Sequence, residues 1–152
     1  MIERLDSLAD EIGNLQSKLA LLIGPPRSGK GGLIRNLALR RKNLVLNVGV
    51  ALGRQLLAVP GHRRHLKAAE LLRSLADECA NDGLILLDNL ELLFDRTLQL
   101  NPLDLLKRNA HARRVIAVWP GQIHDNRLTY ASMGHPEYQD YAINGLVPFR
   151  ID

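Results

Sequence analysis

One short segment constrains this chain more than any other: the loop Gly24–Lys30, which lies between an apolar run and a region of helical periodicity. It reads Gly-Pro-Pro-Arg-Ser-Gly-Lys and matches the glycines and the lysine of the Walker A pattern. Gly24 lets the chain turn out of a strand, and Gly29 lets backbone N–H groups approach an anion closely. The helix that follows directs its free N–H groups at the same place. The segment therefore predicts a phosphate-binding loop in which Lys30 contacts the terminal phosphates.

The whole loop is expected to take part in nucleotide binding. We assign phosphate contacts to the consecutive residues Gly24, Pro25, Pro26, Arg27, Ser28, Gly29, Lys30, Gly31 and Gly32. The Walker A pattern places Ser or Thr after the lysine, where the hydroxyl binds Mg²⁺. Gly31 and Gly32 have no hydroxyl, so we expect a water molecule to replace it and Mg²⁺ to bind more weakly.

A second acidic position follows the apolar run 84–87, which ends at Asp88. An aspartate at the end of a buried strand can hold Mg²⁺ through water, as a Walker B residue does. Many P-loop ATPases have a glutamate next, which activates the attacking water, but Asn89 cannot accept a proton. Glu91 is the nearest acid and is our candidate catalytic base, provided that the chain turns sharply after Asp88; a surface or capping role is the alternative.

Apolar runs alternate with helical patterns along the chain. Short runs bounded by turn residues predict buried strands at 19–23, 44–48, 84–87 and 115–118. A further strand at 145–151 is expected at an edge, because Pro148 does not suit a central strand. Helical periodicity predicts helices at 2–13, 30–40, 50–58 and 66–80, and one more that opens at Asn101-Pro102. Residues 122–145 are polar, and we predict that they are irregular.

This alternation predicts an α/β fold with a parallel sheet covered by helices on both faces. The length of 152 residues fits one domain that spans the whole chain. The single cysteine, Cys79, excludes an internal disulfide and lies on the apolar side of a predicted helix, which indicates a core position. The N-terminus lacks a signal-peptide pattern, and no apolar stretch approaches the roughly 20 residues that span a bilayer. We therefore expect a cytoplasmic protein that has no membrane contact.

The basic residues do not identify one class of binding partner. The net charge is +4, and arginines cluster at 40–41, 63–64 and 113–114. Such an excess is compatible with nonspecific contact to DNA, with an acidic partner or with an ordinary solvated surface. Arg113, Arg114 and Arg127 are also candidates for a charge donated to the nucleotide of a neighbouring subunit.

Trp119 follows the predicted strand 115–118. At this place a P-loop enzyme would have a polar sensor residue beside the γ-phosphate. The side chain of Trp119 is large and apolar, so we expect it to be a half-buried anchor.

Several segments, taken together, resemble a known family. They are Gly24–Lys30, Leu46–Gly49, Leu87–Phe94, Val118–Gly121, Leu128–Tyr130 and Gly134–Tyr138. In these segments the chain resembles BrxF, the small P-loop protein of BREX bacteriophage-exclusion systems, and the similarity runs over nearly the whole chain. The resemblance implies a minimal AAA+-like P-loop NTPase core without a helical lid. It also implies a role in antiviral defence beside a large AAA+ ATPase, a DNA methyltransferase and a phosphatase-like protein.

The chain departs from this family inside the loop. BrxF proteins usually carry a hydroxyl residue after the loop lysine, whereas this chain has Gly31, and it also has Arg27 within the loop. These departures predict slow hydrolysis rather than a loss of nucleotide binding. The leading prediction is an ATP-binding, slowly hydrolysing subunit of a phage-defence complex that uses ATP and Mg²⁺.

Three other interpretations remain open from the sequence. The first is a nucleotide-gated assembly module with little turnover, and the second is a DNA-binding accessory that uses the arginine clusters. The third and most distant is a small nucleotide kinase, because Lys30-Gly31 resembles the loop of adenylate-kinase-like enzymes, although Gly32 replaces their threonine. Self-association is expected with the leading interpretation, since AAA+-like cores commonly complete their site with an arginine from a neighbour.

Overall fold

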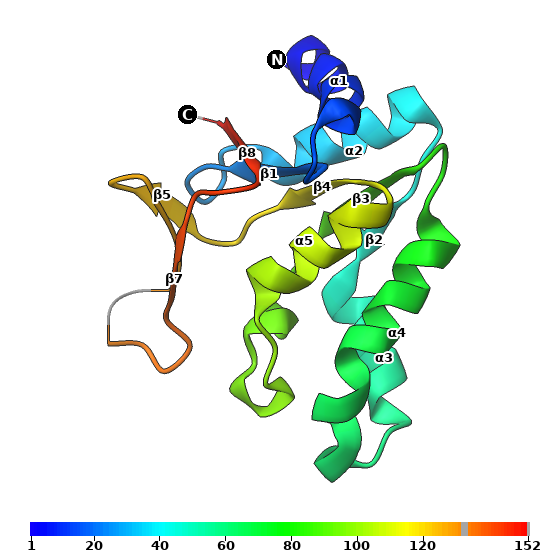
Figure 1. The fold of residues 1–152 in the computed structure, drawn as a ribbon, viewed down its shortest axis with the longest axis vertical. Coiled ribbons are helices and arrows are strands. Elements are labelled where there is room, and N and C mark those ends of the chain that lie inside the picture. The colour runs from blue at the N-terminus through cyan, green and yellow to red at the C-terminus, as the bar shows by residue number, and fades with distance from the viewer. Residues whose placement is uncertain (132–133, 152) are drawn as a thin grey trace.

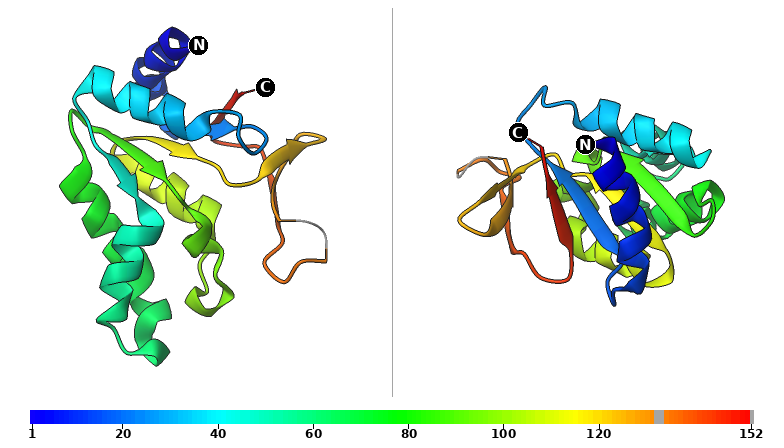
Figure 2. Two further views of the ribbon diagram at one scale, coloured as in Figure 1. Left: turned by 180° about the vertical axis from the view of Figure 1, so that it is seen from behind. Right: turned by 90° about the horizontal axis from the view of Figure 1, so that it is seen from above.

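A computed structural model describes residues 1–131 and 134–151, and Figure 1 shows its fold. In these residues, five strands form a parallel sheet in the order β2-β3-β4-β1-β8. Their bounds are β1 Leu19–Ile23, β2 Val45–Asn47, β3 Leu84–Asp88, β4 Arg114–Val118 and β8 Val147–Arg150. Strand β8 lies beside β1 at the edge of the sheet (Figure 2), as the proline at position 148 predicted.

Helices cover both faces of this sheet, which confirms the predicted α/β layering. Their bounds are α1 Ile2–Glu11, α2 Lys30–Arg41, α3 Val48–Leu57, α4 Arg64–Cys79 and α5 Pro102–Ala112. Single turns of 3₁₀ helix occur at η1 Ile12–Asn14, η2 Gly61–Arg63, η3 Glu91–Phe94 and η4 Arg96–Leu98. Helices α1 and α2 lie on one face, and α3, α4 and α5 lie on the other (Figure 1). The described part of the chain has no helix that is both long enough and apolar enough to cross a membrane.

Helix α3 begins earlier than the sequence pattern predicted, at Val48 rather than at Val50. The reason is the side chain of Asn47, which accepts a hydrogen bond from the backbone N–H of Val50 at 3.1 Å and so caps the helix. This cap shortens the preceding strand, which ends at Asn47 itself.

Alternate side chains of the central strands belong to two separate apolar clusters, one on each face of the sheet. In β1, Leu19 and Leu21 pack in the first cluster, between the sheet and α3, α4 and α5. Ala20 and Leu22 pack in the second cluster, between the sheet and α1 and α2. Successive residues of a strand point to opposite faces, so a strand that is buried on both faces has to be apolar throughout. Cys79 is half-buried and packs against the margin of the first cluster, and burial raises the pKa of its thiol.

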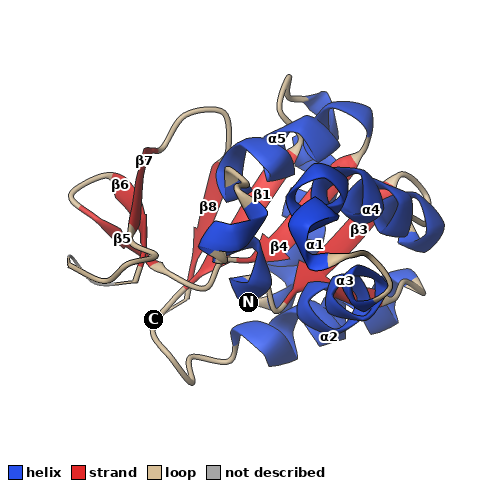
Figure 3. Cartoon of the chain, turned by 90° about the horizontal axis from the view of Figure 1, so that it is seen from below, coloured by secondary structure: helices blue, strands red, loops and turns tan. Residues whose placement is uncertain are grey.

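The prediction that residues 122–145 are irregular was wrong for the described residues of this segment, which exclude 132–133. They contain an antiparallel sheet of β5 Gln122–His124, β6 Arg127–Tyr130 and β7 Gln139–Ala142, set to one side of the helical layers (Figure 3). Asp125 and Asn126 have φ values of 50° and 59° and form the two-residue turn between β5 and β6. Asp and Asn tolerate this left-handed conformation, which matches the twist of a tight hairpin. The Asp-Asn pair was therefore the sequence signal that had been missed.

Trp119 joins this second sheet to the core. Its side chain is fully buried, and its indole Nε1 donates a hydrogen bond to the carbonyl oxygen of Thr129 at 2.9 Å. Its ring packs edge-on against Phe94 and Tyr141, with centroid distances of 5.4 and 6.0 Å. Trp119 is thus an anchor that is more completely buried than the sequence suggested, and its indole does not take the place of a polar sensor.

The contact between Trp119 and Thr129 leaves no room for a side chain at Gly121, which generates the first prediction. A Cβ atom at Gly121 would lie 1.7 Å from the backbone oxygen of Thr129, so Gly121→Ala has to displace β6. We expect it to lower the free energy of unfolding by about 3 kcal/mol, measured by urea denaturation. Gly61→Ala is the matched control because a Cβ at Gly61 meets no atom within 4 Å. Equal effects of the two substitutions would contradict this account of the junction.

Candidate functional site

The loop Gly24–Lys30 leaves the sheet at the end of β1 and enters α2 at Lys30. Gly24 is needed because a Cβ there would lie 2.5 Å from the backbone oxygen of Ile151. Ile151 directly follows β8, and its backbone N–H donates a hydrogen bond to the carbonyl oxygen of Ile23 at 2.8 Å. The end of the described chain therefore packs on the start of the loop and fixes its path.

The loop backbone alternates in hand before the helix begins. Arg27 has a φ of 63° and Gly29 a φ of 94°, and the N–H of Ser28 donates to the carbonyl oxygen of Pro25 at 3.1 Å. A change of hand between neighbouring residues turns backbone N–H groups toward one point, which is a geometry that binds anions. The first N–H groups of α2 lack helical acceptors and point the same way. The loop backbone therefore has a geometry that can bind an anion, and the assignment of phosphate contacts to it stays a prediction.

The ammonium group of Lys30 lies across the mouth of the loop. Its Nζ donates to the carbonyl oxygen of Gly24 at 2.8 Å and to that of Trp119 at 3.4 Å. Burial lowers the pKa of Lys30 below its usual range, against the charges of Glu91 and Asp88, which raise it. In residues 1–131 and 134–151 no carboxylate lies within 4.0 Å of this Nζ. An ammonium that has lost water without gaining a close anion is suited to bind one.

The structure brings the two predicted acids to the same side of the molecule as Lys30. Asp88 is the last residue of β3, and its Oδ1 accepts a hydrogen bond from the N–H of Asn89 at 2.7 Å. The chain then turns sharply, because Asn89 has a φ of 57°. The turn places Glu91 where its charge acts on the pKa of both Lys30 and Tyr130. The condition that we set for Glu91 is therefore met, although its role in catalysis stays a prediction.

Asn89 has a structural function that its sequence position did not reveal. Its side-chain Nδ2 donates to Oδ1 of Asn47 at 2.8 Å, and its carbonyl oxygen accepts from the N–H of Gly49 at 3.0 Å. A Cβ at Gly49 would lie 2.6 Å from that same Nδ2, so only glycine allows this approach. We call Asn47, Gly49 and Asn89 the asparagine clamp. It ties the start of α3 to the end of β3.

The residues around Gly31 do not fit the usual Mg²⁺ site of a P-loop. Asp88 supplies one carboxylate, but Gly31 and Gly32 supply no oxygen ligand from their side chains. A Cβ at position 31 would lie 3.7 Å from Oδ2 of Asp88 and 3.2 Å from Nη1 of Arg35. A guanidinium group thus lies next to the position from which a serine or threonine hydroxyl would extend. Nor do the described residues contain any group of three His, Cys, Asp or Glu side chains that could hold a metal ion.

The second sheet supplies a wall that the sequence did not predict. A cavity of about 420 Å³ is lined by Lys30, by Pro120 and by residues of the second-sheet region that include His124 and Tyr138. This volume falls within the range of small-molecule sites. Because the described residues of the predicted irregular segment form a folded sheet, the loop faces a half-open cavity and not a flat surface.

The arginines that were candidates for a donated charge are used inside the fold. Arg113 forms an ion pair with Asp77, and Arg114 donates to the carbonyl oxygens of Ala9 and Asp82 at 2.8 and 2.6 Å. Both side chains are mostly buried, at the start of β4 and therefore at the end of the strand that is remote from the loop.

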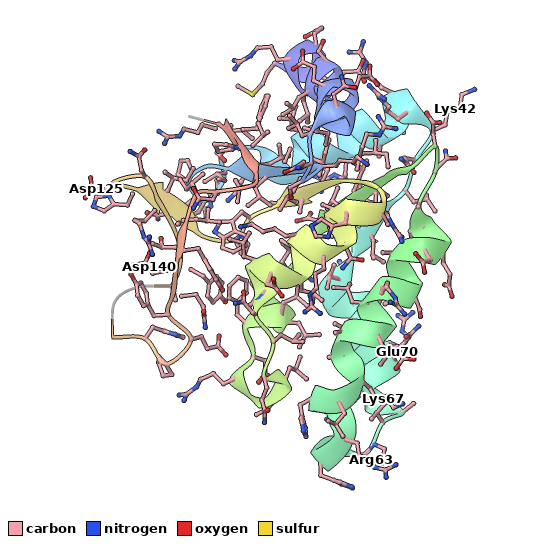
Figure 4. All side chains as sticks on the ribbon, in the orientation of Figure 1. Lys42, Arg63, Lys67, Glu70, Asp125 and Asp140 are labelled. Atoms are coloured by element: carbon pink, nitrogen blue, oxygen red, sulfur yellow. The ribbon has the colours of Figure 1, made fainter. Side chains whose placement is uncertain are left out.

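Arg127 instead pairs with Asp140 of β7, at 2.7 Å between Nε and Oδ1. Figure 4 labels Asp140 on the second sheet. The side chain of Arg127 is half-exposed. Of the three arginines proposed from sequence, it is therefore the one that lies on the same sheet as the cavity wall.

Comparison with solved structures finds proteins of similar fold. No family model and no curated protein matches this chain. Among solved structures, the chain is similar to C. elegans PCH-2, with 18% sequence identity and a TM-score of 0.49. The match covers 99% of this chain and 41% of that one, so this chain spans less than half of the length of that protein. The proposals below therefore rest on the residues of this chain.

The asparagine clamp generates the second prediction. Asn47→Ala and Asn89→Ala each break the amide hydrogen bond, so their effects on the free energy of unfolding should not add. We expect a coupling energy of about 1 kcal/mol from a double-mutant cycle followed by urea denaturation. The strain of alanine at the positive φ of position 89 occurs in both the single and the double variant and cancels.

Asn47→Asp is the control for this cycle, because it keeps the acceptor oxygen for both Asn89 and Val50. It should change stability by less than either alanine variant. Strictly additive effects of the two alanine substitutions would mean that the clamp contributes nothing.

Proposed function

We propose that this chain binds ATP through the loop Gly24–Lys30. The observation that carries the proposal is the ammonium of Lys30, which is half-buried, bonded to two carbonyl oxygens and directed across a loop with anion-binding backbone geometry. Two of its three N–H donors are used, so one is left for a phosphate oxygen. The adjoining cavity, lined in part by Tyr138 and His124, is large enough for the rest of a nucleotide.

We propose further that any hydrolysis by the isolated chain is slow. The residue after Asp88 is held in the asparagine clamp and has no proton-accepting group. Glu91 is exposed and acts on Lys30 through its charge, so it is the candidate to activate water. A site with this composition is better suited to bind a nucleotide than to turn it over quickly. This supports the nucleotide-gated module as the second candidate function.

The finer proposal concerns the setting of this activity. The resemblance to BrxF supports a role as a subunit of a BREX-type antiviral system in the bacterial cytoplasm, beside DNA-directed partners. Basic side chains that include Arg63 and Lys67 lie at the N-terminal end of α4 (Figure 4), away from the second sheet. Such a group provides nonspecific electrostatic attraction for DNA or for an acidic partner. Both the partner and the contact with DNA are proposals from sequence.

The third prediction tests nucleotide binding directly. Lys30→Ala removes a charge-assisted hydrogen bond to phosphate, so the Kd for ATP should rise about 10- to 100-fold in isothermal titration calorimetry. Lys67→Ala is the control: it removes the same charge from α4, where Lys67 pairs with Glu70 at 3.9 Å. An unchanged affinity in Lys30→Ala would refute the assignment of the loop.

The fourth prediction concerns turnover. The isolated protein should hydrolyse ATP well below about 10 s⁻¹, a typical enzyme rate. Glu91→Gln should lower the remaining rate by about 100-fold, because the amide cannot accept a proton, while the Kd for ATP stays within a few-fold. Glu70→Gln, on α4, should change neither value. A rate that survives in Glu91→Gln would exclude Glu91 as the base.

A further inference from the structure

Two charged groups approach the same point beside the loop, on the α2 side. The point is the empty Cβ position of Gly31, which lies 3.2 Å from Nη1 of Arg35 and 3.7 Å from Oδ2 of Asp88. One group comes from α2 and the other from the end of β3. Glycine at position 31 is what leaves the space for both of them.

The geometry of α2 explains why Arg35 reaches this point. Residues four apart lie on one face of a helix, and their side chains lean toward its N-terminus. Arg35 therefore extends back along α2 from the position one turn after Gly31 and reaches the loop. In residues 1–131 and 134–151, Arg35 forms no ion pair within 4.0 Å, and its side chain is exposed. Its donors are thus free for a ligand.

We propose that Arg35 supplies the positive charge that Mg²⁺ supplies in other P-loops, so that this loop binds the phosphates of ATP without a divalent cation. The inference rests on the proposed function and adds the cation requirement of the same site. A guanidinium group presents a planar fork of donors that matches phosphate oxygens. Asp88 approaches the same point from the end of β3, but it is too far from Arg35 to form an ion pair within 4.0 Å.

The same geometry disfavours Mg²⁺ at this place. Mg²⁺ requires a near-octahedral shell of oxygen atoms, and position 31 provides none from a side chain. Two cations next to one carboxylate also repel each other at short range. Free ATP, which carries its full negative charge, is therefore the form that this site favours.

The test is calorimetric titration of the full chain with ATP, once in excess EDTA and once in excess Mg²⁺. For the unmodified protein we expect binding in EDTA that is at least as tight as binding in Mg²⁺. Arg35→Ala should weaken binding in EDTA by about tenfold or more, the loss expected for one charge-assisted hydrogen bond. Arg40→Ala removes the same charge from the last turn of α2 and should leave the affinity unchanged.

A second variant tests the same idea in the opposite direction. Gly31→Ser restores the missing hydroxyl, and its Cβ would require only the flexible end of Arg35 to move. It should make ATP binding depend on Mg²⁺. Because Arg35 is exposed and position 31 lies in the first turn of α2, circular dichroism should show that both variants fold.

The outcomes separate this inference from the proposed function. Binding by the unmodified protein that requires Mg²⁺, or an Arg35→Ala variant that binds in EDTA as tightly as Arg40→Ala, overturns the role of Arg35 and leaves the loop assignment intact. No binding by the unmodified protein in either condition overturns both proposals. Binding that persists in EDTA and is lost in Arg35→Ala supports both.

Discussion

Burial of the parallel sheet on both faces is the constraint on which the rest of this structure depends. The interior residues of β1, β3 and β4 are apolar on both sides, so they cannot present a charge to solvent. Polar chemistry is thereby confined to the places where these strands end. Because neighbouring strands are parallel, their carboxyl ends share one edge of the sheet. Asp88 is the last residue of its strand, and Gly24 and Trp119 directly follow theirs, so the candidate site is a consequence of the layering.

The second sheet lies beside the carboxyl-terminal edge of the parallel sheet and is joined to it by close contacts. Trp119 hydrogen-bonds Thr129, Gly121 allows the backbone of β6 to approach, and Tyr130 stacks on Phe94 with a centroid distance of 3.7 Å. These contacts extend the first apolar cluster to the antiparallel strands, where Leu128 is fully buried. The apolar side of the second sheet is therefore continuous with the core, although the sheet lies outside the helical layers. The residues of this region that line the cavity beside Lys30, among them Gln122 and His124, are exposed.

The features that could be predicted from sequence are those set by nearby residues. The apolar runs, the loop Gly24–Lys30 and the edge position of Pro148 depend on local periodicity and backbone preference. The segment 122–145 was misread because its strands are short and half-exposed, so they lack the apolar runs by which the central strands were recognised. The Asp125-Asn126 turn was a local signal, but it carries less weight without flanking apolar residues. The functions of Arg113 and Arg114 depend on distant partners, Asp77 and Asp82, which no local pattern identifies.

The asparagine clamp shows why one residue cannot serve both the fold and fast catalysis at this position. The left-handed backbone of Asn89 allows the turn that brings Glu91 toward Lys30, and its amide must donate to Asn47 to hold α3 in place. A carboxylate at position 89 would lose that donor and would place its charge against the side-chain Oδ1 of Asn47. Position 89 therefore has an amide, and the nearest acid is Glu91, two residues further along the chain. Its side chain is exposed, so its orientation is less constrained. A comparable replacement occurs at position 31, where glycine stands in place of a metal-binding hydroxyl residue and leaves space for the side chain of Arg35. For the function that we propose, both replacements favour nucleotide binding over rapid hydrolysis, because phosphate binding needs only fixed positive charge whereas hydrolysis also needs an oriented base.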